Sequence, residues 1–505
     1  MDAGAAGTPT ERTAVVIGGG ISGLLAAREL ARAGVRTTVL EAGEAWGGCV
    51  GSHAVAGLTL DSGAESFATR TSAVADLAAE LGIAGEIVAP NPGGAWVQLP
   101  DGPRELPKTG VLGIPASPWD PEVRRSLGLL GSLRASVDAV LPASLGTAAE
   151  ATSVSDLVRR RMGRRVLDRL VAPVVGGVHS ADPAVLDVDM VAPGLRAGIR
   201  QHGSLAAAVA AQRRGKAAAA AGTAASAGPG GHGKTRSAGL QKAGSAVAGL
   251  RGGMHTLVAA LLADLRRRGV TLLSGTPARS VQRTAGGWRV TTDGSAFDAG
   301  LLVVALDGPA AVGLLAETLP ELDRLRPDAG PDVSLVTLVV DIPALDAAPR
   351  GTGVLVAPQS PGVQAKALTH ATAKWAWLAD RTGPGRHVLR LSYGRAVAPR
   401  GVPESRGGGV APAPRSDDEL FRAALADASA LLGVPVSAGD VAGWDVVRWA
   451  GALPFASLGH KQRVAAVRNV CAADGTLAVV GGWLSGNGLA AIVADTPQQV
   501  RSLLS

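Results

Sequence analysis

The chain has 505 residues, and apolar residues make up 47% of it, which is enough for a large core and excludes wholesale disorder. Aromatic residues make up only 3%, so a base-stacking surface for nucleic acid is not expected. The net charge of +7 fits either a general arginine bias or an anionic small-molecule partner, and no basic run marks a nucleic-acid-binding arm.

The first elements predict a strand–helix–strand unit. Residues 14–17 and 37–40 are short apolar runs, and residues 21–33 between them carry leucines at helical spacing. Gly18, Gly20 and Gly23 occupy the turn into the helix. There the first glycine permits a tight turn, the second lets a pyrophosphate approach the backbone, and the third lets helix and strand pack closely. The helix N-terminus would offer its N–H groups to the phosphates.

Glu41 ends the second strand, eighteen residues after Gly23. A carboxylate there would accept hydrogen bonds from ribose hydroxyls and disfavours a 2′-phosphate, so the pattern predicts a dinucleotide other than NADP. The alternative is a glycine-rich turn that holds no ligand.

Helical and strand patterns follow along the chain. Residues 72–200 predict mainly helices, including one over 155–170. Residues 216–244 are almost entirely Ala, Gly, Ser and Lys, which predicts a flexible insert, and residues 401–414 predict a Pro/Gly-rich loop. Strands are predicted over 270–273, 288–292 and 301–305, which we expect to form one small sheet, and over 333–340. A last short helix is expected after Pro497.

Cysteine usage and the termini indicate the compartment. Cys49 and Cys471 lie far apart without metal-ligand spacing, which predicts a reducing environment and no metal site. Residues 477–494 carry no charge, but glycines interrupt them. We therefore expect a buried strand, a glycine loop at Gly486 and Gly488, and a helix start at Leu489, rather than a membrane span. With no leader pattern at the N-terminus, the chain is expected in the cytoplasm, without a transmembrane segment.

The residues after the first unit resemble the FAD-binding start of the flavin amine oxidase superfamily. Glu41 and Ala42 are followed by the pair Gly47 and Gly48, in the arrangement typical of that superfamily. Two basic residues that usually flank the glycine pair are Ala45 and Cys49 here. The resemblance implies FAD as the cofactor, with other groups replacing two phosphate or flavin contacts.

Later segments resemble the porphyrinogen oxidases within that superfamily. The motifs, in chain order, are D-S-G-A-E-S-F at 61–67, L-P-D-G and G-I-P within 96–115, V-V-G-G-V-H-S-A-D-P at 174–183, K-A-L-T-H-A-T-A-K-W at 366–375, A-L-P and G-H within 452–460, and the glycine loop at 481–488. The similarity implies oxidation of a porphyrinogen with FAD and dioxygen. It most resembles the branch that acts on coproporphyrinogen III in haem biosynthesis, in three two-electron steps that yield three hydrogen peroxide.

Three alternatives stay open: a protoporphyrinogen IX oxidase, another flavin amine oxidase or desaturase, and a non-catalytic flavoprotein. The partners expected from the resemblance are a porphyrinogen with several carboxylates and dioxygen, with contact to a downstream haem-pathway enzyme left open. No nucleic-acid partner is expected.

The resemblance also implies a set of site residues. The expected cofactor-binding residues are Gly18, Gly20, Ile21, Ser22, Gly23, Glu41, Ala42, Gly47, Gly48, Ala278, Trp483, Gly486, Gly488 and Leu489. Ala278 would act through its backbone at the adenine, and Trp483 would either border the flavin or fill the core. No catalytic side chain stands out. Lys374 would face the substrate cavity or a surface acid, and Arg70 would pair with a propionate or be a solvated loop residue.

The expected fold is mixed α/β, with a Rossmann-like FAD-binding domain, a substrate-binding sheet domain and a helical domain. The FAD-binding parts are predicted at 1–85, 247–310 and 431–505. The helical part is predicted at 86–205, the flexible insert at 206–246, and the substrate-binding part at 311–430.

Overall fold

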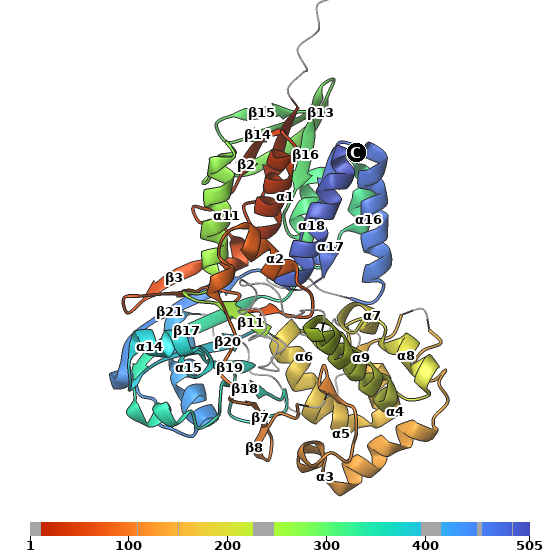
Figure 1. Ribbon diagram of the computed structural model, residues 1–505, viewed down its shortest axis with the longest axis vertical. Helices are drawn as coiled ribbons and strands as arrows, with labels where there is room; N and C mark the ends of the chain where they lie inside the picture. Colours follow the sequence, from red (N-terminus) through yellow and green to blue (C-terminus); the bar gives the residue numbers. More distant parts are fainter. Residues whose placement is uncertain are drawn as a thin grey trace, which may run out of the picture.

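The computed structural model describes residues 12–108, 110–149, 151–225, 247–394, 416–451, 457–486 and 488–505. Figure 1 shows three lobes: one around a parallel sheet at the top, one around a seven-stranded sheet at the lower left, and one of helices at the lower right. The predicted α/β class, with a Rossmann-like lobe beside a sheet lobe and a helical lobe, is confirmed.

The upper lobe is built on a five-stranded parallel sheet of order β12-β2-β1-β16-β22. Its strands are β1 (Thr13–Ile17), β2 (Arg36–Leu40), β12 (Thr271–Leu273), β16 (Leu301–Val304) and β22 (Leu477–Val479). Helices α1 (Ile21–Arg32), α11 (His255–Arg267) and α18 (Leu489–Leu504) pack on one face. Helix α16 (His460–Asp474) and a small antiparallel sheet cover the other. The predicted strands at 14–17 and 37–40 and the helix between them are confirmed.

The expectation that 270–273, 288–292 and 301–305 form one small sheet is wrong. Strands β12 and β16 belong to the parallel sheet, whereas β14 (Gly287–Thr292) pairs with β13 (Ala278–Thr284) and β15 (Ala296–Ala299). Strand β16 is buried at all four positions, as befits a parallel strand covered on both faces, while β14 buries only alternate residues. Burial thus distinguishes β16 from β14, whereas β12, at the edge of the parallel sheet, is only partly buried.

The lower-left lobe contains a seven-stranded mixed sheet of order β21-β17-β20-β19-β18-β7-β8. Its strands are β7 (Ala95–Leu99), β8 (Gly102–Glu105), β17 (Val333–Asp341), β18 (Gly353–Val356), β19 (Ala367–His370), β20 (Arg386–Tyr393) and β21 (Val441–Trp449). The predicted strand at 333–340 is β17. Val336, Leu338 and Val340 of β17 pack against α15 (Asp417–Leu432). The sheet combines strands from three of the predicted segments: 86–205, 311–430 and 431–505.

The third lobe is helical, around a separate apolar core. Its main helices are α3 (Pro121–Ser136), α4 (Val154–Met162), α6 (Ala172–His179), α8 (Leu195–His202) and α9 (Leu205–Ala225). The single helix predicted over 155–170 is interrupted at Gly163, whose φ of +91° ends α4 before the short α5 (Arg164–Val166).

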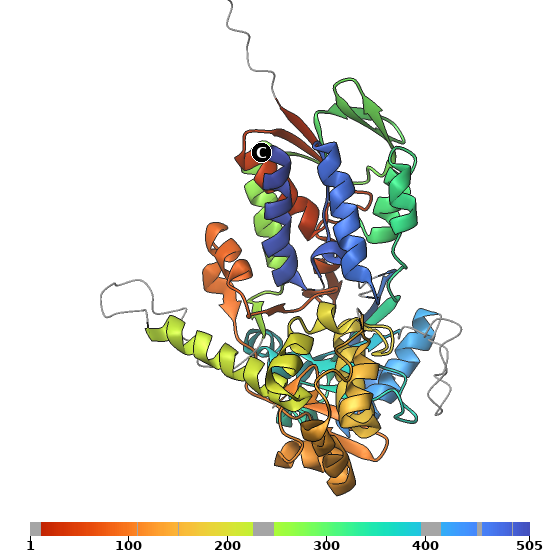
Figure 2. The same ribbon diagram turned by 90° about the vertical axis from the view of Figure 1, so that its right-hand side faces the viewer.

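Helix α9 extends further than composition predicts. It runs from Leu205 to Ala225, so residues 206–225 of the insert predicted at 206–246 form a helix instead, and Figure 2 shows this helix projecting from the helical lobe. Alanine has the highest helix propensity, so an alanine-rich run favours helix rather than flexibility. Residues 226–246 of the predicted insert, and the loop predicted at 401–414, lie outside the described residues.

The C-terminal elements follow the expected order of strand, glycine loop and helix. Strand β22 leads through α17 (Gly482–Ser485) to α18, which begins at Leu489 as expected. The expectation of a separate short helix after Pro497 is wrong, because Pro497 lies within α18. Within the described residues, no helix is long and apolar enough to cross a membrane.

Candidate cofactor and substrate site

The glycine loop between β1 and α1 leaves its backbone uncovered at one position. A Cβ on Gly18 would lie 2.5 Å from the carbonyl oxygen of Ala305, and one on Gly23 would lie 1.8 Å from that of Gly18. Both positions therefore require glycine for packing. A Cβ on Gly20 would meet nothing within 4 Å. This open space lies at the N-terminus of α1, where backbone N–H groups lack helical acceptors.

Ile21 and Ser22 form the first turn of α1, and both are buried. Their side chains therefore pack inside the lobe. What they can offer a ligand is their backbone N–H groups at the helix start, as expected for an anion-binding turn.

Glu41 lies at the end of β2 and holds the glycine loop in place. Its carboxylate accepts hydrogen bonds from the backbone N–H of Gly19 at 2.6 Å and of Gly43 at 2.7 Å. A carboxylate has lone pairs for further donors, so these two bonds leave capacity for ribose hydroxyls. Ala42, next along the chain, is exposed.

The second glycine pair lies directly against the first loop. The N–H of Gly47 donates to the carbonyl oxygen of Gly19 at 2.8 Å, and a Cβ on Gly48 would lie 3.5 Å from the Cα of Gly20. Gly47 has a φ of +101°, and a Cβ there would meet Val258 at 2.7 Å. The structure thus brings the two predicted motifs together in one uncovered backbone cradle.

The C-terminal glycine loop reaches the same edge of the parallel sheet. Residues Ile17, Val304 and Val479 are aligned in register, so the loops that follow β1, β16 and β22 leave from one carboxyl edge. Gly486 and Gly488 have φ values of +99° and +116°, and a Cβ on either would meet nothing within 4 Å. Open α/β sheets bind ligands at this edge.

Leu489 opens α18 and is buried against the α1 face of the sheet. Its helix is sixteen residues long, so it provides a second helix N-terminus at the C-terminal glycine loop.

Trp483 fills the core beside this loop. Its side chain is 3% exposed and packs over Gly308, and the donor Nε1 has no acceptor among the described residues. His460 Nε2 donates to the Trp483 carbonyl oxygen at 2.6 Å, and burial lowers the pKa of His460, which keeps the ring neutral. A buried indole N–H without an acceptor is a place where a bound group could supply one.

Ala278 begins β13, close to Glu41. Two residues earlier, the Thr276 N–H donates to the Glu41 carbonyl oxygen at 2.8 Å, and Ala278 itself is half-buried. Its backbone is thus near the predicted ribose position. Sequence reasoning missed the contact between Gly19 of the first loop and Trp46, which precedes the second glycine pair: a Cβ on Gly19 would lie 2.5 Å from the Trp46 ring.

Lys374 meets a buried acid rather than a surface one. At the end of α13 (Ala371–Lys374), its Nζ forms an ion pair with Glu65, which also accepts from Arg390 of β20 at 3.0 Å. Burial alone would raise the pKa of Glu65, but the charges of Lys374 and Arg390 outweigh it and lower that pKa to about 2. Two cations on one carboxylate leave a net positive charge, and sequence reasoning found only Lys374 of the three.

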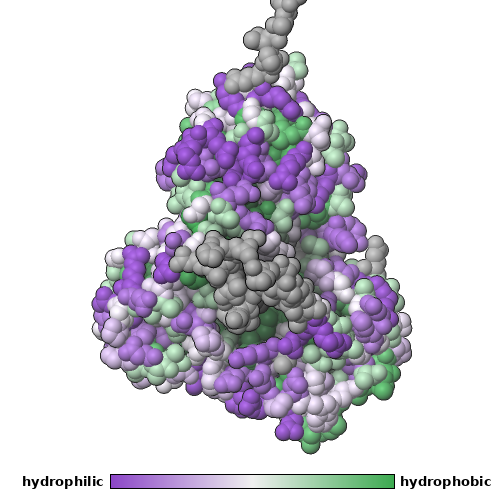
Figure 3. All heavy atoms as spheres, viewed as in Figure 1, coloured by the Kyte–Doolittle hydropathy of each residue, from purple (hydrophilic) through white to green (hydrophobic). Residues whose placement is uncertain are grey.

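Arg70 does not join this cluster. It is exposed in the turn after β5 (Phe67–Ala68), and no ion-pair partner is found for it within the described ranges. Figure 3 shows the face on which the lobes meet, with a hollow below its centre that is hydrophobic inside and has a hydrophilic lower border.

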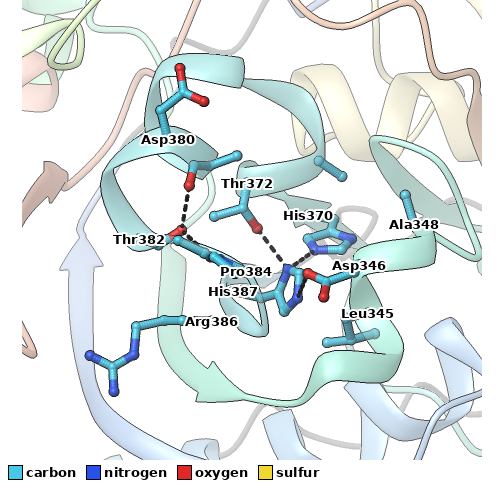
Figure 4. A pocket seen from close by; sticks show the side chains of 13 residues that line it. Leu345, Asp346, Ala348, His370, Thr372, Asp380, Thr382, Pro384, Arg386 and His387 are labelled. Atoms are coloured by element: carbon cyan, nitrogen blue, oxygen red, sulfur yellow. Dashed lines mark hydrogen bonds and ion pairs between the residues drawn. The ribbon is translucent and has the colours of Figure 1, made fainter.

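A separate cavity of about 460 Å³ lies at one end of the seven-stranded sheet (Figure 4). His370 Nε2 and His387 Nδ1 lie 3.0 Å apart beside it, and His387 Nε2 lies 3.2 Å from Asp346. Burial lowers the pKa of His370 to about 4. None of the predicted cofactor residues lines this cavity. Across the described ranges, no three His, Cys, Asp or Glu side chains gather as metal ligands.

Comparison with known proteins gives the family. Residues 21–495 match the flavin containing amine oxidoreductase family, so the chain belongs to it. It is 31% identical to the coproporphyrinogen III oxidase of Propionibacterium freudenreichii subsp. freudenreichii. The alignment covers 95% of this chain and 88% of that protein. It is 29% identical to the coproporphyrinogen III oxidase of Mycobacterium leprae, over 98% of both chains.

The fold comparison agrees. The crystal structure of an Exiguobacterium protein described as a protoporphyrinogen oxidase superposes with a TM-score of 0.76 at 24% identity, over 98% of both chains. Cyclohexylamine oxidase from Brevibacterium oxydans superposes with a TM-score of 0.63 at 17% identity. The resemblance to porphyrinogen oxidases stated from the motifs is confirmed.

Proposed function

We propose that the protein oxidises coproporphyrinogen III to coproporphyrin III with FAD and dioxygen, in haem biosynthesis. The substrate loses six electrons and six hydrogens, and three dioxygen molecules take them up as three hydrogen peroxide. The observation that carries the proposal is the similarity, over nearly the whole chain, to proteins named coproporphyrinogen III oxidase. The glycine loops at one sheet edge supply the matching cofactor site.

The residues at that edge fit a bound FAD. Gly18 and Gly23 set the turn, and the uncovered backbone at Gly20 and Gly48 would receive the pyrophosphate. Glu41 would accept from the ribose, and the backbone of Ala278 would contact the adenine. When bound, FAD supplies two-electron oxidation and passes the electrons to dioxygen.

The C-terminal loop would hold the flavin ring. The backbone at Gly486 and Gly488 is uncovered, and the N-terminus of α18 at Leu489 would favour negative charge at the pyrimidine edge. Trp483, with its unpaired Nε1, would border the ring.

The lobes would have different roles in binding the cofactor and the substrate. Segments 1–85 and 247–310, with the part of 431–505 that follows β21, would form the FAD-binding part, and 86–205 and 311–430, together with β21, would enclose the substrate. Residues 206–225 of the predicted insert form α9 and would belong with the helical lobe. We place the enzyme in the cytoplasm, where contact with a downstream haem-pathway enzyme would let the product pass on. Arg70 would approach a substrate propionate from the surface.

Protoporphyrinogen IX is the second candidate substrate. It is favoured by a 31% identity over 36% of this chain to protoporphyrinogen oxidase 2 of Arabidopsis thaliana. The two substrates differ in carboxylates: four propionates against two.

Two measurements on the purified protein test the proposal. The visible spectrum should show flavin bands, and the cofactor released on denaturation should be FAD. In air, porphyrin fluorescence should grow faster from coproporphyrinogen III than from protoporphyrinogen IX. A protein without flavin, or one that oxidises neither porphyrinogen, would contradict the proposal, and a preference for protoporphyrinogen would select the second candidate.

A further inference from the structure

The ion cluster of Lys374, Glu65 and Arg390 joins the upper lobe to the lobe of the seven-stranded sheet. Glu65 lies between β4 (Leu58–Asp61) and β5, and the N–H of its neighbour Ala64 donates to the Cys49 carbonyl oxygen at 2.8 Å. Cys49 follows Gly48, so the cluster is one short loop away from the cofactor cradle. The three side chains are only 13–16% exposed.

The sheet face that carries Arg390 turns toward the other lobes. Arg390 pairs across the sheet with Thr369 and Thr337, on the face opposite the apolar one that packs on α15. On the same face, the side chain of Leu355 lies 2.5 Å from where a Cβ on Gly177 of α6 would sit. Arg390 therefore lies on the sheet face that meets α6 further along, and the cluster itself lies between the sheet and the upper lobe that carries the glycine loops.

Arg390 and Lys374, the two cations of the cluster, make different contacts. Arg390 donates to the Gly63 carbonyl oxygen at 2.7 Å, reaches that of Asp61 at 3.4 Å, and pairs with Glu65, so it fastens the sheet to the upper lobe. Lys374 contacts one oxygen acceptor, Glu65, within the described residues, and its Nζ lies 5.1 Å from the centroid of the Trp375 ring. An ammonium has three donors, so Lys374 keeps at least one N–H for another acceptor.

We propose that Lys374 is a specificity-determining residue that binds a carboxylate of the substrate and favours a porphyrinogen with four carboxylates over one with two. The inference rests on the proposed function. Glu65 pairs with both Lys374 and Arg390, so it neutralises only one of the two cations and competes with a substrate carboxylate for Lys374. A vinyl group at the same position would leave the Lys374 donors without an acceptor, which penalises the dicarboxylate substrate.

The test compares kcat/KM for coproporphyrinogen III with that for protoporphyrinogen IX. Lys374→Met should lower this ratio about tenfold, the scale of one charge-assisted hydrogen bond, and the loss should lie mainly in KM. Lys374→Arg should retain most of the ratio. Lys461→Met, at an exposed lysine of α16, is the matched control and should leave it unchanged.

A second variant moves the ratio in the opposite direction. Glu65→Gln removes the competing carboxylate while keeping Lys374, so the ratio should rise. It also keeps the test decisive if Lys374→Met does not fold. A ratio unchanged within about twofold in both variants, in protein that still oxidises porphyrinogens, would overturn the role of Lys374 and leave the proposed function standing. Wild-type protein that oxidises neither substrate would refute both.

Discussion

Asp61 caps helix α11 from the end of strand β4. Its carboxylate accepts hydrogen bonds from the backbone N–H groups of Met254 at 2.9 Å and His255 at 3.1 Å. These N–H groups lie at a helix start, where no helical acceptor exists. An acid from the D-S-G-A-E-S-F motif thus stabilises a helix nearly two hundred residues away in sequence.

Replacing Asp61 with Ala should lower the free energy of unfolding by about 1–2 kcal/mol, because the two N–H groups lose their acceptor. Urea unfolding followed by circular dichroism measures it. Asp418→Ala, at an exposed position in the first turn of α15, is the control and should have a much smaller effect. Equal effects from the two substitutions would show that Asp61 is not a significant cap.

Gly20 and Gly23 should respond differently to the same substitution. Gly23→Ala should fail to fold or lose several kcal/mol, because its Cβ would collide with the Gly18 carbonyl oxygen. Gly20→Ala should keep its stability, since the Cβ has room, but should bind FAD at least about tenfold more weakly because the methyl occupies the phosphate position. Thermal unfolding of the apoprotein and flavin-fluorescence titration separate the two effects. Full FAD affinity in Gly20→Ala would count against the cradle.

Acid stability should depend on Glu65. Its pKa is lowered from 4.5 to about 2, so the unfolded chain binds the proton more readily and stability falls as the pH drops through this window. The contribution, up to about 3 kcal/mol, is present above pH 4.5 and is lost toward pH 2. Glu65→Gln should flatten this part of the curve of unfolding free energy against pH. An acid limb identical to that of the wild type would contradict the ion cluster.

His370 should make stability depend on pH at higher values than Glu65 does. The pKa of His370 is lowered from 6.5 to about 4 by burial and by the neighbouring His387, so protonation favours the unfolded chain between these values. The wild type should lose up to about 3 kcal/mol as the pH falls from 6.5 to 4. In His370→Gln this slope should shrink, whereas the slope below pH 4 should stay. Differential scanning calorimetry across the range measures both, and an unchanged slope between pH 6.5 and 4 would refute the assignment.

Local sequence predicts the first cofactor loop well, because one strand, one helix and the glycines between them lie within thirty residues. Gly18, Gly20 and Gly23 have the packing and the open space that their spacing predicts. The C-terminal loop was also predictable, since glycines with positive φ follow a fully buried strand there.

Sheet membership was not predictable, because it depends on which distant strands meet. Strands β12, β14 and β16 are all short, and the strands that each one pairs with decide its sheet. The cluster around Lys374 was missed for the same reason: Glu65 lies 309 residues away in sequence, and no local pattern pairs them. Pro497 led to the wrong prediction that a separate helix begins after it. A proline inside a long helix such as α18 is tolerated when packing outweighs one lost hydrogen bond.

The register that aligns Ile17 with Val304 and Val479 has a consequence for the order of folding. The candidate cofactor edge takes one loop from after β1 and another from after β22, so it needs contacts between residues that lie far apart in the sequence. All the strands of the seven-stranded sheet precede β22 in the chain, so that sheet can pair without it. We therefore expect the candidate edge to be completed late in folding, after the seven-stranded sheet.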